Sequence, residues 1–130
     1  MYTFQTQLSL TVEQAIPVVL EQLKKEGFGV LMDLDIQATM KQKVGAEISA
    51  YHILGACNPQ LAHQALMSEP EVGALFPCNV VVRAEGDKTI VSFMDPQAMK
   101  QMTANPKVHA VAGEAEVRLR RVCEALAAYS

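Results

Sequence analysis

Two short segments of the sequence set a cysteine directly beside an asparagine. Residues 55–59 read GACNP, and residues 77–80 read PCNV. A thiolate is both a nucleophile and a metal ligand, and an amide side chain can donate and accept hydrogen bonds. Cys57, Asn58, Cys78 and Asn79 are therefore the residues best suited to bind a small ligand or a metal ion, or to carry out thiol chemistry.

Cys57 comes directly before the predicted start of a helix. Backbone amides and the helix dipole favour negative charge there, which would lower the pKa of a thiol. The alternative is that Cys57 and Cys78 are small apolar residues at the ends of strands. An antiparallel pairing of their two strands would bring the thiols to the same end of the sheet, whereas a parallel pairing would separate them. The sequence leaves both pairings open.

The two asparagines have different explanations. Asn58 stands before Pro59, and this pair is typical of a helix N-cap followed by the first helical residue. Asn79 lies inside a predicted strand and has no such role, so we expect it to make a structural hydrogen bond or to contact a ligand. With Tyr51 from the preceding strand, these residues and the two cysteines form the predicted ligand pocket.

Other possible ligands are scattered along the chain. No Cys or His pair has the spacing of a zinc site, so if a metal binds, Cys57 and Cys78 are its expected ligands. His52 is expected to be a hydrogen-bonded core or interface residue. Asp33 and Asp35 share one side of a strand and could act as acid and base, although a solvated edge explains them as well.

Three methionines, Met94, Met99 and Met102, surround a short predicted helix. Thioethers can bind Cu(I), but methionines more often fill an irregular core or a dimer contact. The sequence alone does not separate these roles.

Composition narrows the class of protein. The chain has 130 residues, a net charge of -3 and no basic run, which argues against a nucleic-acid partner. Arg118, Arg120 and Arg121 are expected to form the solvated face of the last helix. No signal peptide and no membrane span are predicted. Three cysteines without a secretion signal indicate reduced thiols in a cytoplasm.

The apolar pattern predicts a single α+β domain over residues 1–130, in the order β-α-β-(α)-β-α-β-β-α-α. Strands are predicted over 2–10, 28–36, 48–57, 78–85 and 89–94, with a two-residue hairpin turn at 86–87. Helices are predicted over 12–26 and 36–44 and from residues 59, 96 and 106 onward. We expect a mixed sheet with helices mainly on one face. The uncovered face predicts a homodimer.

The chain resembles the prokaryotic domain-of-unknown-function family 302, an uncharacterised family. The matching segments are EGFGV at 26–30, Tyr51, ILGACNP at 53–59, Leu61-Ala62, Ala65-Leu66, PCNVVV at 77–82 and Asp95-Pro96. The resemblance covers nearly the whole chain. It implies a small α+β domain that forms homodimers, and it implies no established activity or cofactor.

Three hypotheses about function follow. The first is a non-enzymatic homodimer that binds a small molecule or a metal in the pocket of Tyr51, Cys57, Asn58, Cys78 and Asn79. The second is a thiol-dependent redox enzyme or sensor that uses Cys57 with Cys78. The third is a structural or protein-interaction module in which both segments only join strands to helices.

Overall fold

The computed structural model describes residues 1–130 and contains five strands, five α-helices and two short 3-10 helices. The strands are β1 (Thr3–Leu8), β2 (Gly29–Asp35), β3 (Tyr51–Cys57), β4 (Cys78–Glu85) and β5 (Lys88–Met94). The α-helices are α1 (Val12–Lys25), α2 (Ile36–Val44), α3 (Pro59–Ser68), α4 (Gln97–Lys100) and α5 (Pro106–Leu126). The 3-10 helices are η1 (Pro70–Leu75) and η2 (Ala127–Tyr129). The predicted α+β class and order of elements are confirmed, and only the 3-10 helices were not predicted.

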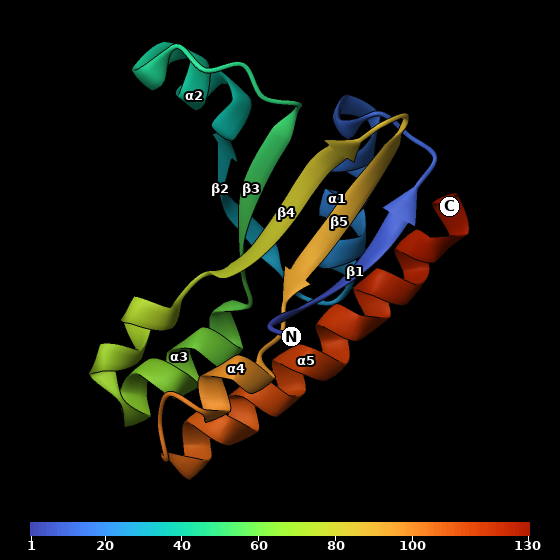
Figure 1. The fold of residues 1–130 in the computed structure, drawn as a ribbon. Coiled ribbons are helices and arrows are strands. Elements are labelled where there is room, and N and C mark those ends of the chain that lie inside the picture. Colours follow the sequence, from blue (N-terminus) through green and yellow to red (C-terminus); the bar gives the residue numbers. More distant parts are fainter.

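The five strands form one sheet in the order β1-β5-β4-β3-β2, and every neighbouring pair is antiparallel. The prediction of a mixed sheet is therefore wrong. The reason lies in the connection from β3 to β4, where α3 and η1 lie beyond the end of the sheet (Figure 1). Because this connection does not run back along the sheet, β4 begins at the end where β3 stops, and the pair must be antiparallel.

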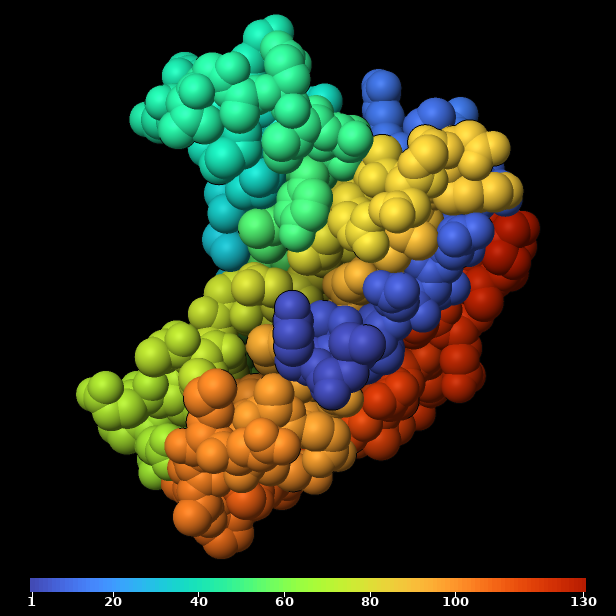
Figure 2. Space-filling view, viewed as in Figure 1, coloured from blue at the N-terminus to red at the C-terminus, as the bar shows by residue number.

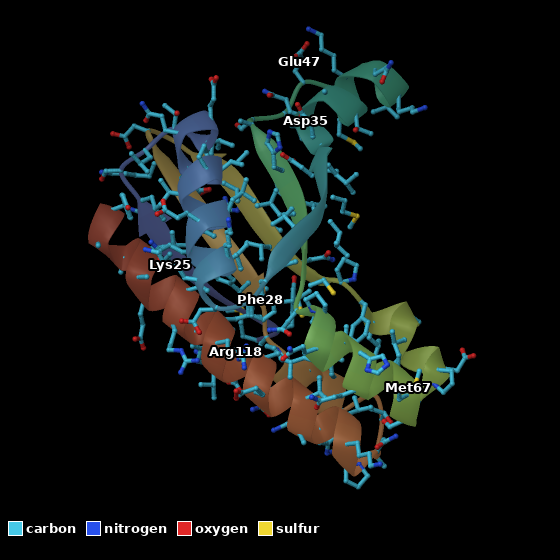
Figure 3. The ribbon with its side chains drawn as sticks, turned by 180° about the vertical axis from the view of Figure 1, so that it is seen from behind. Lys25, Phe28, Asp35, Glu47, Met67 and Arg118 are labelled. Carbon is cyan, nitrogen blue, oxygen red and sulfur yellow. The ribbon has the colours of Figure 1, made fainter.

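Helices α1 and α5 cover one face of the sheet (Figure 3). Their apolar sides meet alternate residues of the strands, as expected for a sheet with one buried face. The main core contains these fully buried residues: Leu8, Ala15, Val19, Leu23, Leu54, Ala56, Val80, Val82, Val91, Phe93, Leu119 and Leu126. No helix covers the opposite face, in agreement with the prediction that helices lie mainly on one side.

A second, smaller core lies beyond the end of the sheet. It forms where α3, η1 and α4 pack on the first half of α5, and it contains Ala65, Val72, Met99, Val108, Val111 and Ala112. Polar contacts also join the segments at the ends of these helices: Thr103 Oγ1 donates to Glu69 Oε1 over 2.8 Å, and Asn105 Nδ2 donates to the backbone oxygen of Ser68 over 3.4 Å. Main core and small core meet at the end of β3 and the start of β4.

The segment of β2, α2 and the residues up to Ile48 projects from the body, and we call it the β2–α2 arm (Figure 1). A bulge between Val30 and Met32 interrupts the pairing of β2 with β3. Helix α2 contributes no buried residue, although Asp35 caps it by accepting the N–H of Ala38 over 2.9 Å. The arm and the small core enclose a deep indentation on one side of the molecule (Figure 2).

The three arginines of α5 are not simply solvated. Arg118 and Arg121 reach Glu26 at the end of α1, and Arg120 pairs with Asp95 over 3.4 Å. Arg120 also lies over the Phe4 ring at 4.3 Å, a cation–π contact. These arginines therefore hold α5 against its neighbours. None of the helices has both the length and the apolar character that crossing a membrane would require.

Candidate functional site

The strand register brings the two cysteines together. In the antiparallel pair of β3 and β4, Ala56 lies opposite Cys78 and Gly55 lies opposite Asn79. Cys57 is the last residue of β3 and Cys78 is the first residue of β4, so both thiols lie at the same end of the sheet. Of the two pairings that the sequence left open, the structure has the one that joins the cysteines.

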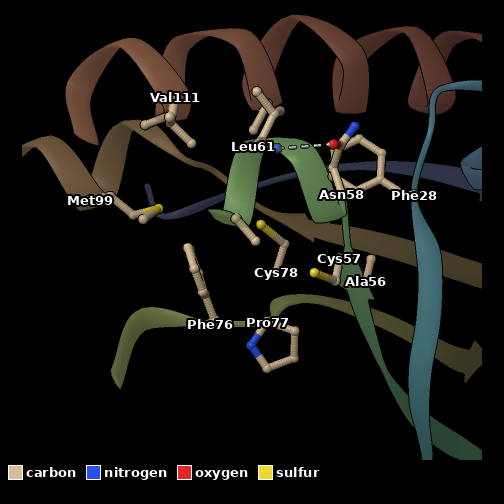
Figure 4. A pocket seen from close by; sticks show the side chains of 13 residues that line it. Phe28, Ala56, Cys57, Asn58, Leu61, Phe76, Pro77, Cys78, Met99 and Val111 are labelled. Atoms are coloured by element: carbon tan, nitrogen blue, oxygen red, sulfur yellow. Dashed lines mark hydrogen bonds between the residues drawn. The ribbon is translucent and has the colours of Figure 1, made fainter. Parts of the chain in front are cut away.

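Both thiols line one narrow cavity, which we call the thiol crevice (Figure 4). Its volume is about 30 Å³, and eleven of its thirteen lining residues are hydrophobic. The lining comes from the ends of β3 and β4, the start of α3, the segment before β4, α4 and α5: Phe28, Ala56, Cys57, Asn58, Leu61, Ala62, Phe76, Pro77, Cys78, Met99, Val111, Ala112 and Ala115. The crevice therefore lies where the main core and the small core meet.

Asn58 is positioned by its role as a helix cap. Its Oδ1 accepts the N–H of Leu61 over 3.2 Å, and the side chain is only 7 % exposed. Its amide Nδ2 lies against Gly27, where an added Cβ would be 2.9 Å away. Gly27 also has a φ of 83°, which favours glycine. The capping role predicted for Asn58 is confirmed, and the cap fixes where α3 begins beside Cys57.

The remaining predicted pocket residues lie elsewhere. Asn79 is exposed on the uncovered face of the sheet and lines a neighbouring groove. Tyr51 begins β3, opposite Arg83, whereas Cys57 ends it. At about 3.4 Å per residue, the length of this strand puts Tyr51 roughly 20 Å from the thiols. Of the five predicted pocket residues, the structure gathers Cys57, Asn58 and Cys78 around one cavity.

Burial holds both thiols in the neutral form. Burial, together with a smaller effect of negative charge on nearby Cys57, raises the pKa of Cys78 to about 11. Burial also raises the pKa of Cys57 above its ordinary value. Because the thiolate is the reactive form, these shifts oppose nucleophilic chemistry at neutral pH. The sequence suggested a lowered pKa for Cys57 at the start of α3, whereas burial raises it.

Comparison with known proteins shows the family to which this chain belongs. The family model described as "Domain of unknown function DUF302" matches residues 4–126. The chain belongs to this family. No curated protein matches it. Among solved structures, the crystal structure of an uncharacterised conserved DUF302 protein from Bacillus stearothermophilus is similar over 95 % of this chain and 97 % of that one, with 30 % identity and a TM-score of 0.87. DUF302 membership establishes the fold and assigns no specific function.

Gly55 has a packing role in this DUF302 chain. A Cβ at this position would lie 2.8 Å from side-chain atoms of both Met32 and Pro77. These two side chains therefore lie directly over the backbone of β3, next to Cys57. The Phe76–Pro77 peptide bond is cis. Glycine at position 55 lets Pro77 close this side of the thiol crevice.

The histidines and aspartates form no second cluster of ligands. His52 Nδ1 lies 2.6 Å from Asp33 Oδ1 on the face of the sheet that α1 covers, so His52 is hydrogen-bonded, as expected, but only partly buried. His109 contacts the backbone oxygen of Thr103. No three His, Cys, Asp or Glu side chains are arranged to hold a metal ion.

Sequence reasoning missed several residues of the crevice. The sequence groups Met99 with Met94 and Met102 but gives no sign of its place beside the cysteines. Phe76 stands directly before Pro77 and was not singled out. On α5, Val111, Ala112 and Ala115 belong to the apolar stripe that the sequence showed, yet the part of the stripe that faces the thiols depends on how α5 packs. Small residues at 112 and 115 were the available signal of a gap beside the helix.

Proposed function

We propose that this chain binds one soft metal ion, Cu(I), between the thiols of Cys57 and Cys78. The observation that carries the proposal is the antiparallel register of β3 and β4, which brings two cysteines into one apolar crevice. Thiolate sulfur is a preferred ligand of Cu(I). Cu(I) accepts two or three sulfur ligands, whereas structural zinc takes four ligands in a tetrahedron.

The size of the crevice supports a guest of atomic size. Its volume of about 30 Å³ leaves room for a guest of only a few atoms. Pockets for organic ligands are at least about tenfold larger. Of the two kinds of guest that the sequence suggested, the small volume of the crevice favours a metal ion over an organic molecule.

Charge at the start of α3 also supports the proposal. Two thiolates and one monovalent cation leave a net negative charge at the site. Cys57 precedes Asn58, the N-cap of this ten-residue helix, so the helix N-terminus offsets part of the cost of burying this negative charge. The apolar lining keeps water from competing with the sulfur ligands.

The two alternative functions have less support. A thiol enzyme or redox sensor needs a thiolate at neutral pH, and burial raises the pKa of both cysteines. A purely structural role explains Asn58 and Gly55, but it does not require two cysteines to line one cavity. An interaction module that binds no metal is the result that would replace the proposal.

The experiment is a competition titration of reduced, oxygen-free protein with Cu(I) and a chromophoric chelator. Wild type is expected to bind one Cu(I) per chain. Cys57→Ser and Cys78→Ser should each weaken binding by more than about 100-fold, because loss of a ligand costs at least as much as loss of an outer-shell partner. Cys123→Ser is the matched control, because this third free cysteine lies on α5 outside the crevice. Unchanged binding by Cys57→Ser and Cys78→Ser would overturn the proposal.

We propose that the β2–α2 arm binds a second copy of the chain, because apolar side chains are exposed along it. Large apolar side chains are exposed along this arm: Leu31, Met32, Leu34, Val44 and Ile48. Such a cluster on one projecting element is typical of an interaction surface. Sedimentation equilibrium should give a dimer, and Leu31→Lys with Val44→Lys should give a monomer. A wild-type monomer at micromolar concentration would contradict this part of the proposal.

The setting that we propose is the cytoplasm of a prokaryote. Three free cysteines fit a reducing compartment, and the similar DUF302 structure is from Bacillus stearothermophilus. Fractionation of the native cells, with immunodetection of the chain, tests this placement, and recovery from an oxidising compartment would contradict it.

A further inference from the structure

A second cavity adjoins the thiol crevice and contains three methionines. We call it the methionine groove. Its volume is about 230 Å³, and its lining includes Met94, Met99 and Met102 together with Phe76 and Pro77. Phe76, Pro77 and Met99 also line the thiol crevice. The two cavities therefore share one wall, and Met99 is the sulfur-bearing residue of that wall.

The three thioethers differ in depth. Met102, after α4, is 70 % exposed, whereas Met99 within α4 is 4 % exposed. Met94 ends β5 and is half-buried. In Figure 4 the Met99 side chain extends from α4 toward the side of the crevice where Cys78 lies. The three thioethers thus range from the exposed Met102 to the buried Met99, which also lines the thiol crevice.

Filling a core does not account for all three residues. Met99 belongs to the small core and is packed as a methionine in an irregular core would be. Met102 gains little from burial, because most of its side chain is in water. A leucine would serve a packing role at Met94 or Met99 equally well. What the three residues share is a thioether that lines one groove.

We propose that the methionine groove is the entry path by which Cu(I) reaches Cys57 and Cys78, an inference that rests on the proposed function. The ion comes from a complex with a low-molecular-weight thiol, and it remains Cu(I) throughout. Bonds from copper to the donor thiolates break while bonds to the thioethers of Met102 and Met94 form, and the donor thiolates take up protons from water.

Transfer inward follows from the different chemistry of the two sulfur types. A thioether is uncharged and binds Cu(I) without releasing a proton, whereas a thiolate binds it more strongly. Copper exchanges its bonds to Met102 and Met94 for a bond to Met99. That bond breaks as copper forms bonds to the sulfurs of Cys57 and Cys78, whose two protons pass to water. Because Met99 lines both cavities, it is the thioether placed to pass the ion from the groove to the thiols.

The test uses protein labelled with ¹³C at the methionine methyl groups and Ag(I) as an air-stable substitute for Cu(I). It is made first on the variant Cys57→Ser with Cys78→Ser, so that only the thioethers are available. The methyl signals of Met94, Met99 and Met102 are expected to shift on titration. Met67 is the internal control, because it is 71 % exposed, lies on the outer side of α3 and does not line the groove (Figure 3). Unshifted groove signals, or an equal shift of Met67, would overturn the entry path.

A rate measurement completes the test and separates the two proposals. Cu(I) is supplied to wild type as its glutathione complex, and loading is followed by the absorption of the copper–thiolate bonds. Met94→Leu with Met102→Leu should slow loading at least about tenfold and leave the equilibrium affinity unchanged, whereas Met67→Leu should load like wild type. Equal loading rates would refute the path while leaving the thiol site intact. Shifted groove signals with no copper bound by wild type would refute the thiol site, and with it the role of the groove as its entry.

Discussion

A rise of one pH unit between about pH 6 and about pH 8 is expected to tighten Cu(I) binding by about 100-fold. The reason is the protonation state of the crevice. Burial raises the pKa of Cys78 to about 11 and raises that of Cys57 as well, so both thiols hold a proton throughout this range. Binding to both sulfurs must release two protons, and each proton contributes a factor of about ten per pH unit.

The sign and size of this dependence separate the possible ligand sets. Each released proton makes Cu(I) binding tighter as pH rises, because protons then compete less well with Cu(I) for the sulfur atoms. Cys57→Ser removes one titrating ligand, so its slope is expected to fall to about tenfold per pH unit. A metal bound by thioethers alone would show no slope.

The assay is the Cu(I) competition titration, repeated at several pH values with a chelator whose own affinity does not change over the range. Cys123→Ser is again the control and should keep the wild-type slope, because this thiol lies outside the crevice. A wild-type slope of tenfold or less would refute the reasoning. It would show that copper binds with at most one of the two thiolates.

Three further predictions concern the stability of the metal-free protein, measured by urea unfolding. Gly55→Ala should cost about 1–3 kcal/mol, because the added Cβ would lie 2.8 Å from Pro77, whereas Gly29→Ala, with no atom within 4 Å, should change stability by less than about 1 kcal/mol; equal effects would contradict the packing argument. Asn58→Ala should cost about 1–2 kcal/mol through loss of the helix cap, and a cost near zero would contradict the capping role. As pH rises from 9.0 to about 11, the free energy of unfolding of wild type should fall by up to about 3 kcal/mol relative to that of Cys78→Ala. The reason is that the Cys78 thiol has a pKa of 9.0 in the unfolded chain and about 11 in the folded protein. Parallel pH profiles of the two proteins would show that Cys78 is not shielded in the fold.

Local patterns predicted most of the fold. The strand from Cys78 to Glu85 and the turn at 86–87 follow from alternation and a Gly-Asp pair. The start of α3 follows from Asn58 and Pro59, whose geometry is local. The mixed sheet was wrong because strand direction depends on where α3 and η1 pack, and this packing is a long-range property. The 3-10 helix η1 has no apolar periodicity of its own that could have indicated its path.

The candidate site was predicted only in part, for the same physical reason. Cys57, Asn58 and Cys78 were named from their neighbours in sequence, and the antiparallel register brought them together. Tyr51 was included although it lies a full strand length away. The relation of Met99 to the thiols is created by the small core, where α4 packs on α5, and no pattern within either helix specifies it.

The most direct test of the central claim is a crystal structure of the reduced protein with one equivalent of Ag(I), which takes the place of Cu(I) and scatters anomalously. One strong anomalous peak is expected in the thiol crevice, within bonding distance of the sulfurs of both Cys57 and Cys78. A peak at any other site, or a crevice without silver beside two intact thiols, would contradict it.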